Sequence, residues 1–355
     1  MSERLQNSDK GARLSIIEYA RYPIHPVKPI KMNAMLAGLF GGGVIGFGLM
    51  FMMERLDRSF RTAEDAKSVL NIQMLGSTSM ILLHENVSVS LVNKIVEKLR
   101  KRFQKYKVLS DMRFISPHIA KKPINSKICA QAVIHHDPKC SVSEEYRILR
   151  TNIQNLGHDK RLRKIIVTSS VRGEGKSTTS MNLAISFADS GKNTLLVDCD
   201  LRRGTLHELM GVSHGPGLTH VLSGNVNCDS AIMKTDIKNL SLLPGGTRPM
   251  KPSEMLGSAR MESIISKLEE QYDVVLMDAP PVLNIPDTCI ISKYSDGVVL
   301  VVQAERTQRE EVVRAQAMLT QSHAPVIGFV LTNVRYYIPK YLYDYYYGDY
   351  DSYSD

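Results

Sequence analysis

A lysine and a serine in a glycine-containing loop supply the clearest chemistry in this sequence. Residues 170–177 read SVRGEGKS, which matches the phosphate-binding pattern G-x-x-x-x-G-K-[ST] except that a serine replaces the first glycine. Backbone amides around Gly173 and Gly175 can surround phosphate oxygens at the start of a helix. Lys176 can reach the β- and γ-phosphates, and the Ser177 hydroxyl can bind Mg²⁺. The loop therefore predicts binding of a nucleotide with its metal ion.

Three aspartates stand where short apolar runs end. Asp198 and Asp200 follow the run at 194–197, and Asp278 follows the run at 274–277. Such short runs of Val and Leu predict buried parallel strands, and open α/β sheets bind ligands beyond the carboxyl ends of their strands. A single aspartate of this kind could be a capping residue. Three of them beside a Gly-Lys-Ser loop are better explained as part of a metal–nucleotide site, with Asp278 holding Mg²⁺ or its water.

The elements that position these residues alternate between strand and helix. The helix after the phosphate-binding loop is expected to run to about Asp189. Further strands are expected at 297–302 and 326–332, with a helix at 307–322 between them. Such alternation is typical of a mostly parallel sheet with helices on both faces. The sequence therefore predicts an α/β fold, with a P-loop NTPase domain at 141–335.

Residues 32–53, MNAMLAGLFGGGVIGFGLMFMM, carry no charge. A helix of this length spans about 33 Å, enough for the hydrocarbon core of a membrane. Gly38, Gly42 and Gly46 are spaced by four, which suits close contact between helices. A signal peptide is disfavoured by the long lead-in and the lack of a small-residue cleavage site, and a buried soluble helix is the other alternative. We therefore predict one transmembrane helix after an extracytoplasmic, proline-containing segment at 1–31.

The 355-residue chain has a net charge of +9, with the excess largely before residue 140. Residues 92–107 combine an apolar helical face with seven Lys and Arg, which suits a helix lying on anionic lipid; a solvated helix resting on protein is the alternative. Positive charge on this side favours a cytoplasmic C-terminal part, and the five scattered cysteines indicate reduced thiols there. We expect residues 54–140 to be a juxtamembrane region and basic linker, and we expect no nucleic-acid partner.

Glu144, Arg147 and Arg150 are spaced by three, so they share one face of a helix for which Ser143 is the expected N-cap. A lone helix would simply expose these side chains to water. Glutamate and arginine on one face can also make charge-assisted contacts to an identical neighbour.

The C-terminal twenty residues, 336–355, contain nine tyrosines and no helical or strand periodicity. They could form a sticky aromatic or aggregation-prone tail. A flexible acidic tail of phenols beside a nucleotide site instead suggests phosphate acceptors, since each phosphate adds roughly −1.5 to −2 charge. The candidate acceptors are Tyr336, Tyr337, Tyr341, Tyr343, Tyr345, Tyr346, Tyr347, Tyr350 and Tyr353.

Taken together, these motifs resemble those of the bacterial tyrosine kinases of exopolysaccharide and capsule assembly. Residues 170–177 match the Walker A loop of that family, residues 195–202 match its Asp-x-Asp-x-Arg motif, and residues 274–281 match its Walker B motif. The Glu-x-x-Arg-x-x-Arg spacing matches its oligomerisation motif. The front of the chain, at 54–65, resembles the end of a polysaccharide co-polymerase domain. The family form has an earlier membrane helix and a large extracytoplasmic domain, neither of which is in this sequence, so we expect a truncated or split version.

The resemblance implies transfer of the ATP γ-phosphoryl group to tyrosines of the tail, with ATP and Mg²⁺ as cofactors. The implied catalytic residues are Lys176, Asp198, Asp200 and Asp278, and the implied metal ligands are Ser177, Asp198 and Asp278. The implied nucleotide-binding residues are Gly173, Glu174, Gly175, Lys176, Ser177, Thr178 and Asn333. It also implies a ring joined through Glu144, Arg147 and Arg150, partners in polysaccharide polymerisation and export, a tyrosine phosphatase, and a single-pass protein of the inner membrane with a cytoplasmic kinase domain.

Two other functions compete with this prediction. Membrane-bound P-loop ATPases of plasmid partition and division-site placement carry a signature lysine five positions before the loop lysine, where this chain has Val171. Those ATPases also lack a tyrosine-rich tail. A non-catalytic co-polymerase scaffold with a degenerate site is the second alternative, and the intact Lys176, Asp198, Asp200 and Asp278 argue against it.

Overall fold

The structure is a computed structural model, and it describes residues 31–56, 59–60, 63–83, 118–120, 128–156 and 162–334. The chain divides into two compact units, Met1–Arg58 and Ser59–Asp355. The predicted amphipathic helix at 92–107, the segment 1–30 and the tyrosines of the tail lie outside the described residues.

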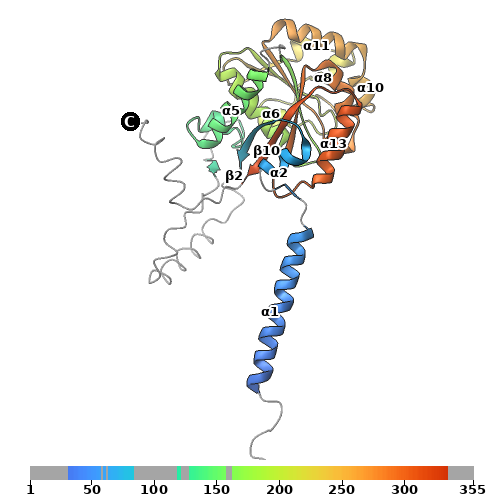
Figure 1. The fold of residues 1–355 in the computed structure, drawn as a ribbon. Helices are drawn as coiled ribbons and strands as arrows, with labels where there is room; N and C mark the ends of the chain where they lie inside the picture. Colours follow the sequence, from blue (N-terminus) through green and yellow to red (C-terminus); the bar gives the residue numbers. More distant parts are fainter. Residues whose placement is uncertain are drawn as a thin grey trace, which may run out of the picture. The chain divides into compact units, whose positions relative to one another are not determined.

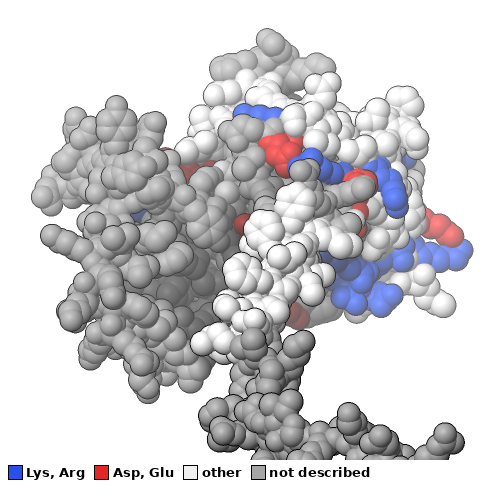
Figure 2. Space-filling model, turned by 60° about the horizontal axis from the view of Figure 1, so that its bottom comes forward, with Lys and Arg blue, Asp and Glu red and all other residues white. Residues whose placement is uncertain are grey.

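The described part of the first unit is a long helix, α1 (Lys31–Leu56). Its window Met35–Met52 is long and apolar enough to cross a membrane, and none of that window is buried. Large side chains such as Leu39, Phe40 and Phe47 are exposed on the helix, and the described side chains on the face seen in Figure 2 are uncharged. This helix is the candidate membrane span predicted at 32–53.

The second unit is built on an eight-stranded sheet with the strand order β1-β10-β9-β4-β8-β5-β7-β6. Neighbouring strands run parallel except for the antiparallel β6–β7 pair at one edge. A separate pair of short parallel strands is formed by β2 (Ile81–Leu83) and β3 (His118–Ala120). The strands of the main sheet are β1 (Met74–Ser79), β4 (Lys164–Ser169), β5 (Thr194–Asp198), β6 (Met233–Lys234), β7 (Leu240–Leu243), β8 (Val274–Asp278), β9 (Gly297–Gln303) and β10 (Val326–Val334).

Helices cover both faces of this sheet, because successive strand residues point to opposite sides and both sides are apolar. Ile166 packs in the core on one face, whereas Ile165 and Val167 pack in the core on the other. Figure 1 shows α10, α11 and α13 on one side of the sheet and α5 on the other. The first face is covered by α2 (Ala63–Leu70), α8 (Leu218–Leu222), α9 (Cys228–Ala231), α10 (Pro252–Leu256), α11 (Ala259–Gln271), α12 (Asp287–Ile291) and α13 (Arg309–Gln321). The second face is covered by α4 (Val133–His136), α5 (Ser141–Leu156), α6 (Lys176–Asp189) and α7 (Leu206–Leu209).

The predicted α/β class and its central elements are confirmed. The predicted strands coincide with β4, β5, β8, β9 and β10, and the helix after the phosphate-binding loop ends at Asp189 as expected. Gly191 follows with a φ of 88°, a left-handed backbone that favours glycine at a helix end.

The sheet also extends beyond the boundary that we expected at residue 141. Within the segment predicted to be a linker, α2 and β1 fold onto the domain, and β1 pairs in parallel with β10. Leu70 and Leu75 are buried there, and the Glu145 carboxylate accepts hydrogen bonds from the amide and hydroxyl of Ser79 at 2.7 and 2.6 Å. The described unit therefore begins at Ser59. The short elements α2 and β1 belong to it because β1 pairs with β10, a strand far along the chain.

The start of α5 differs from the prediction. The helix begins at Ser141 rather than after Ser143. Ser143 is fully buried, and its hydroxyl donates to the Asp137 carbonyl at 2.7 Å. Ser143 is thus a helical residue that bonds back to the preceding turn, and it is not the N-cap.

Candidate active site

The phosphate-binding loop joins β4 to α6 at the carboxyl edge of the sheet. Gly173 and Gly175 have φ values of 85° and 89°, a region where a side chain is strained. Ser170, which replaces the first glycine of the motif, has no positive φ and is buried. A serine is therefore accepted at this position without backbone strain, and the departure from the motif does not disrupt the loop.

The Glu174 side chain points into the protein and not towards a ligand. Its carboxylate accepts hydrogen bonds from the Val171 amide at 2.7 Å and the Thr307 hydroxyl at 2.5 Å, with a longer one from the Gln303 amide at 3.4 Å. Burial raises the pKa of Glu174 to about 6 despite these donors. The sequence predicted Glu174 as a nucleotide-binding residue. Its side chain instead holds the loop, so only its backbone amide is left to bind a phosphate.

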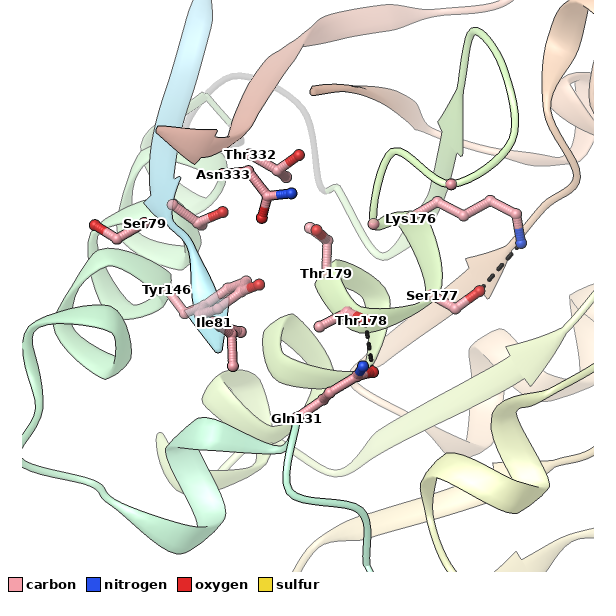
Figure 3. A pocket seen from close by; sticks show the side chains of 13 residues that line it. Ser79, Ile81, Gln131, Tyr146, Lys176, Ser177, Thr178, Thr179, Thr332 and Asn333 are labelled. Carbon is pink, nitrogen blue, oxygen red and sulfur yellow. Dashed lines mark hydrogen bonds between the residues drawn. The ribbon is translucent and has the colours of Figure 1, made fainter. Parts of the chain in front are cut away.

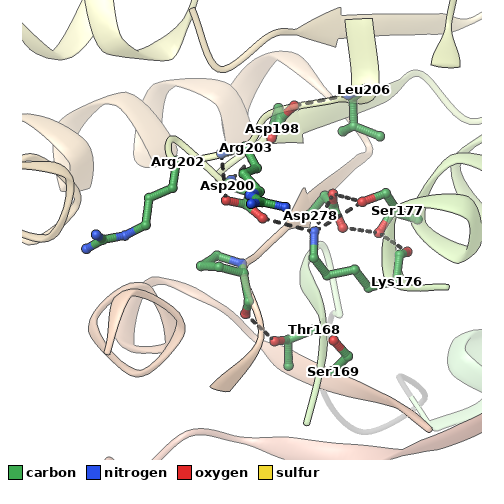
Figure 4. Close-up of polar contacts among 12 residues, drawn as sticks. Thr168, Ser169, Lys176, Ser177, Asp198, Asp200, Arg202, Arg203, Leu206 and Asp278 are labelled. Atoms are coloured by element: carbon green, nitrogen blue, oxygen red, sulfur yellow. Dashed lines mark hydrogen bonds and ion pairs between the residues drawn. The ribbon is translucent and has the colours of Figure 1, made fainter. Parts of the chain in front are cut away.

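Lys176 lies between carboxylates at the start of α6. Its amine is 3.3 Å from Asp200 Oδ2, 3.3 Å from Asp278 Oδ2 and 3.1 Å from Ser177 Oγ. Figure 4 shows the ammonium group among these oxygens. Burial alone would lower the lysine pKa, but the negative charges of Asp278, Asp200 and Asp198 raise it. The structure thus brings together the lysine, the serine and the aspartates that the sequence predicted.

Asp278 is held by two hydroxyls of α6. Ser177 Oγ donates to its Oδ2 at 2.6 Å, and Ser180 Oγ donates to its Oδ1 at 2.9 Å. The Asp278 side chain is 1% exposed. Sequence reasoning did not identify Ser180, although its position one turn after Lys176 places it on the same helical face. Two donors fix the orientation of this carboxylate beside the loop.

Asp198 stands directly opposite Asp278 in the parallel β5–β8 pair. It is completely buried, and it accepts hydrogen bonds from the amides of Asp200 and Leu206, each at 3.2 Å. A Cβ at Gly204 would lie 2.8 Å from Asp198 Oδ2, so the backbone packs closely against the carboxylate only because residue 204 is glycine. Burial, and then the charge of Asp278, raises the pKa of Asp198 to about 7.

Arg202 holds the segment that follows the two aspartates. Its Nε donates to Asp287 Oδ2 at 2.9 Å, and its Nη2 donates to Ser253 Oγ at 3.1 Å. The Asp287 side chain is fully buried, and this hydrogen bond raises the pKa of Arg202. Asp287 and Ser253 are further residues that the sequence did not identify, because they come from α12 and α10, far along the chain.

A cavity of about 400 Å³ opens beside the loop, on the side of β1 and β10. It is lined by the predicted residues Thr178 and Asn333 together with Thr332, Tyr146 and Gln131, which the sequence did not identify (Figure 3). The Thr178 hydroxyl donates to Gln131 Oε1 at 3.2 Å. Burial raises the pKa of Tyr146 to about 12, so its phenol stays neutral. Hydroxyls and amides around the space suit a polar ligand that extends from the phosphate-binding loop.

The donor atoms around Ser177 suit a hard divalent cation. The Ser177 hydroxyl and the Asp278 carboxylate offer only oxygen ligands, which is the set that Mg²⁺ prefers. The third predicted ligand, Asp198, instead accepts hydrogen bonds from the amides of Asp200 and Leu206. Oδ2 of Asp278 lies within 2.6 Å of the serine hydroxyl, so both groups can reach one ion.

The three residues of the predicted oligomerisation motif already make contacts within the chain. Arg147 donates to Glu144 at 2.9 Å and to the Pro138 carbonyl at 2.6 Å. Arg150 donates to the Ser186 carbonyl at 2.8 Å. The Glu144 and Arg147 side chains are 60% and 31% exposed, so this pair still presents charge at the surface of α5.

Comparisons with known proteins give concordant matches. A family model described as "AAA domain" matches residues 162–320. Tyrosine-protein kinase YwqD of Bacillus subtilis (strain 168) is 34% identical over 215 residues, which cover 61% of this chain and 91% of YwqD. Putative tyrosine-protein kinase CapB of Staphylococcus aureus is 31% identical over 222 residues, which cover 61% of this chain and 94% of CapB.

Solved structures agree with these sequence matches. The crystal structure of the chimerical protein CapA2B2 is 27% identical, with a TM-score of 0.62 over 78% of this chain and 100% of that one. The BceF tyrosine kinase domain is 28% identical, with a TM-score of 0.61 over 78% of this chain and 99% of that one. Both matches extend over more of the chain than the sequence matches do.

Proposed function

Since the chain belongs to the bacterial tyrosine-protein kinases, we propose that its site transfers the γ-phosphoryl group of ATP to tyrosines of its own tail at 336–355. The single observation that carries this proposal is the cluster in which the Lys176 amine meets two strand-end carboxylates at 3.3 Å beside the phosphate-binding loop. In such a cluster the lysine can bind phosphate, and the carboxylates can bind a metal ion or accept a proton.

Nucleotide binding requires Lys176 to change partners. Its ammonium leaves the oxygens of Asp200 and Asp278 and contacts the β- and γ-phosphates, while amides of the loop surround the same oxygens. We assign Ser177 and Asp278 as the residues that hold Mg²⁺, which when bound would neutralise charge on the phosphates. Asp198, the third ligand expected from the sequence, is assigned to the proton instead, because a carboxylate bound to Mg²⁺ is a poor proton acceptor. The cavity lined by Tyr146, Thr332 and Asn333 would take the nucleoside part of ATP.

The acceptor phenol must lose a proton as its oxygen bonds to the γ-phosphorus and ADP leaves. A free tyrosine has a pKa near 10, so proton loss has to be coupled to the transfer. Asp198 is the proposed acceptor of that proton, because its pKa of about 7 makes it a stronger base than an ordinary aspartate. Asp200, whose amide donates to Asp198 at 3.2 Å, orients that carboxylate.

The proposed cellular setting follows from the remaining sequence features. α1 would anchor the chain in the inner membrane in a single pass, with the kinase unit in the cytoplasm and residues 92–107 on anionic lipid. Copies would join in a ring through Glu144, Arg147 and Arg150, so that each tail enters a neighbouring site. The proposed partners are the machinery of exopolysaccharide or capsule polymerisation and export, and a tyrosine phosphatase that resets the tail.

The test is to incubate the full chain, in detergent, with γ-labelled ATP and Mg²⁺ and to locate the label by mass spectrometry. We expect phosphotyrosine confined to 336–355 and none in Lys176→Met. Lys164→Met is the matched control, because Lys164 also lies between two carboxylates, Glu269 and Asp296, away from the loop. Release of labelled inorganic phosphate without phosphotyrosine would instead identify an ATPase of the partition type, and no turnover at all would identify a scaffold.

A further inference from the structure

The carbonyl groups of the phosphate-binding loop are all held from within the protein. From residue 170 to residue 174, each of five consecutive carbonyl oxygens accepts a hydrogen bond. The Leu283 amide donates to the carbonyl of Ser170 (3.2 Å), and the Ser169 hydroxyl donates to that of Val171 (2.8 Å). Arg306 donates through Nη2 to the carbonyl of Arg172 (3.3 Å) and through Nη1 to that of Gly173 (3.0 Å). The Thr332 hydroxyl donates to the carbonyl of Glu174 (2.8 Å). Four of the five contacts come from parts of the chain outside the loop's own strand and helix.

Arg306 is distinctive because its planar guanidinium holds two successive carbonyls, those of Arg172 and Gly173. It also donates to Gln303 Oε1 at 3.0 Å. A Cβ added at Gly173 would lie 2.8 Å from Nη1 and 2.9 Å from Nη2. The guanidinium therefore packs closely against the loop at a position where only glycine leaves room for it.

Fixing a carbonyl also fixes an amide, because the two groups of a trans peptide point in opposite directions in one plane. The carbonyl of Arg172 shares its plane with the Gly173 amide, and the carbonyl of Gly173 shares its plane with the Glu174 amide. Arg306 thus turns both of these amides away from itself. The Val171 amide is not part of this set, because it donates to the Glu174 carboxylate.

The segment that carries Arg306 is fixed independently of any ligand. The Glu305 amide donates to the Phe60 carbonyl at 2.8 Å, and the Ala304 amide donates to the Thr332 carbonyl at 2.9 Å. The Thr307 hydroxyl donates to the Glu174 carboxylate. The guanidinium is therefore presented to the loop by neighbours that are already in place.

We propose that Arg306 is a positioning residue, which orients the amides of Gly173 and Glu174 towards the nucleotide phosphates without contacting the nucleotide itself. This inference rests on the proposed ATP-binding function of the loop. Preorganised donors bind an anion more tightly than donors that must be ordered at the moment of binding. Without Arg306 the loop would have to order two peptide groups each time a nucleotide binds.

The test is calorimetric binding of MgADP and MgATP to the full chain in detergent. Arg306→Ala should weaken both by about tenfold, which corresponds to ordering the backbone of about one residue at the moment of binding. Arg314→Ala is the matched control, because Arg314 is an exposed arginine of α13 outside this network. The thermal unfolding temperature without nucleotide should be the same for both variants. A general loss of packing would instead lower this temperature for Arg306→Ala.

Two further measurements separate positioning from simple attraction between charges. Arg306→Lys keeps the charge but loses the planar fork, so it should bind nucleotide as weakly as Arg306→Ala, and the loss should persist from about 0.05 M to about 0.5 M salt. Gly173→Ala strains the loop backbone and also displaces the guanidinium, so the double variant with Arg306→Ala should bind nucleotide no more weakly than Gly173→Ala alone. Wild-type affinity in Arg306→Ala, or full recovery in Arg306→Lys, would overturn the inference while leaving the kinase assignment intact. Absence of nucleotide binding by the wild-type chain would overturn both.

Discussion

Replacing Lys176 by Met should destabilise the kinase unit in a pH-dependent way. The lysine side chain is only 15% exposed, and its partners Asp200 and Asp278 are 10% and 1% exposed. Removing one member of a buried ion pair costs about 3–5 kcal/mol, because the remaining charges stay buried without a partner. We expect a loss near the lower end, about 3 kcal/mol at about pH 8, since the amine retains some contact with water.

The loss should shrink as pH falls. In the wild-type chain Asp198 already has a pKa of about 7, above the ordinary value of 3.8, and removal of the nearest cation raises it further. In the variant, Asp198 therefore stays protonated above pH 7 in the folded state, whereas it is ionised in the unfolded state. The free energy of unfolding of the variant then continues to fall as the pH rises above 7. Each pKa unit is worth 1.36 kcal/mol, and wild-type Asp198 itself titrates across this window, so the loss relative to wild type should shrink by about 1 kcal/mol, to about 2 kcal/mol at about pH 6.

The assay is urea unfolding of the detergent-solubilised chain, followed by circular dichroism at both pH values. Lys164→Met is the control, because the Lys164 amine contacts Glu269 at 2.5 Å and Asp296 at 3.3 Å, yet these carboxylates are 32% and 25% exposed. Water screens such charges, so this variant should lose about 1 kcal/mol or less at either pH. Equal losses for Lys176→Met at the two pH values would show that the amine does not neutralise the strand-end carboxylates.

Three other outcomes are expected. The kcat/KM for MgATP should rise through about pH 7 and level off above about pH 8 as Asp198 ionises, and Asp198→Asn should lower it by about 10²-fold or more; a flat wild-type profile would count against Asp198 as the proton acceptor. Arg147→Glu should lower the oligomer mass and the phosphotyrosine yield together, and an unchanged mass by light scattering would mean that this face of α5 is simply solvated. Asp287→Asn should cost about 2 kcal/mol in urea unfolding, because it leaves the Arg202 guanidinium without its buried partner; a loss below about 0.5 kcal/mol would contradict that role.

The centre of the domain could be predicted because its signals are local. The β-branched and leucine-rich runs of β4, β5 and β8 are short and buried on both faces, which leaves few alternatives to parallel strands. The loop between β4 and α6 carries its glycines, Lys176 and Ser177 in one stretch, so their proximity needs no tertiary information. Asp198 and Asp278 were predicted at strand ends, and parallel pairing in register then places them opposite each other.

The outer parts of the unit carry no comparable local signal. The backbone hydrogen bonds that join β1 to β10 link residues such as Gly76 and Val330, and backbone pairing across such a separation leaves little mark on residue type. The inward orientation of Glu174 was missed for a similar reason. A glutamate inside a phosphate motif looks like a ligand until the fold brings Thr307 and Gln303 against it.

What the sequence by itself determined was therefore the chemistry of the site: a phosphate-binding lysine, a metal-binding hydroxyl and strand-end carboxylates, each set by its immediate neighbours along the chain. Only the tertiary structure decided how that chemistry is supported. Arg306 lies 133 positions from the Gly173 carbonyl that it holds, and Asp287 lies 85 positions from Arg202. Contacts of this kind depend on where the folded backbone carries a side chain, and such positions follow from the packing of the whole sheet and its helices, which no local pattern encodes.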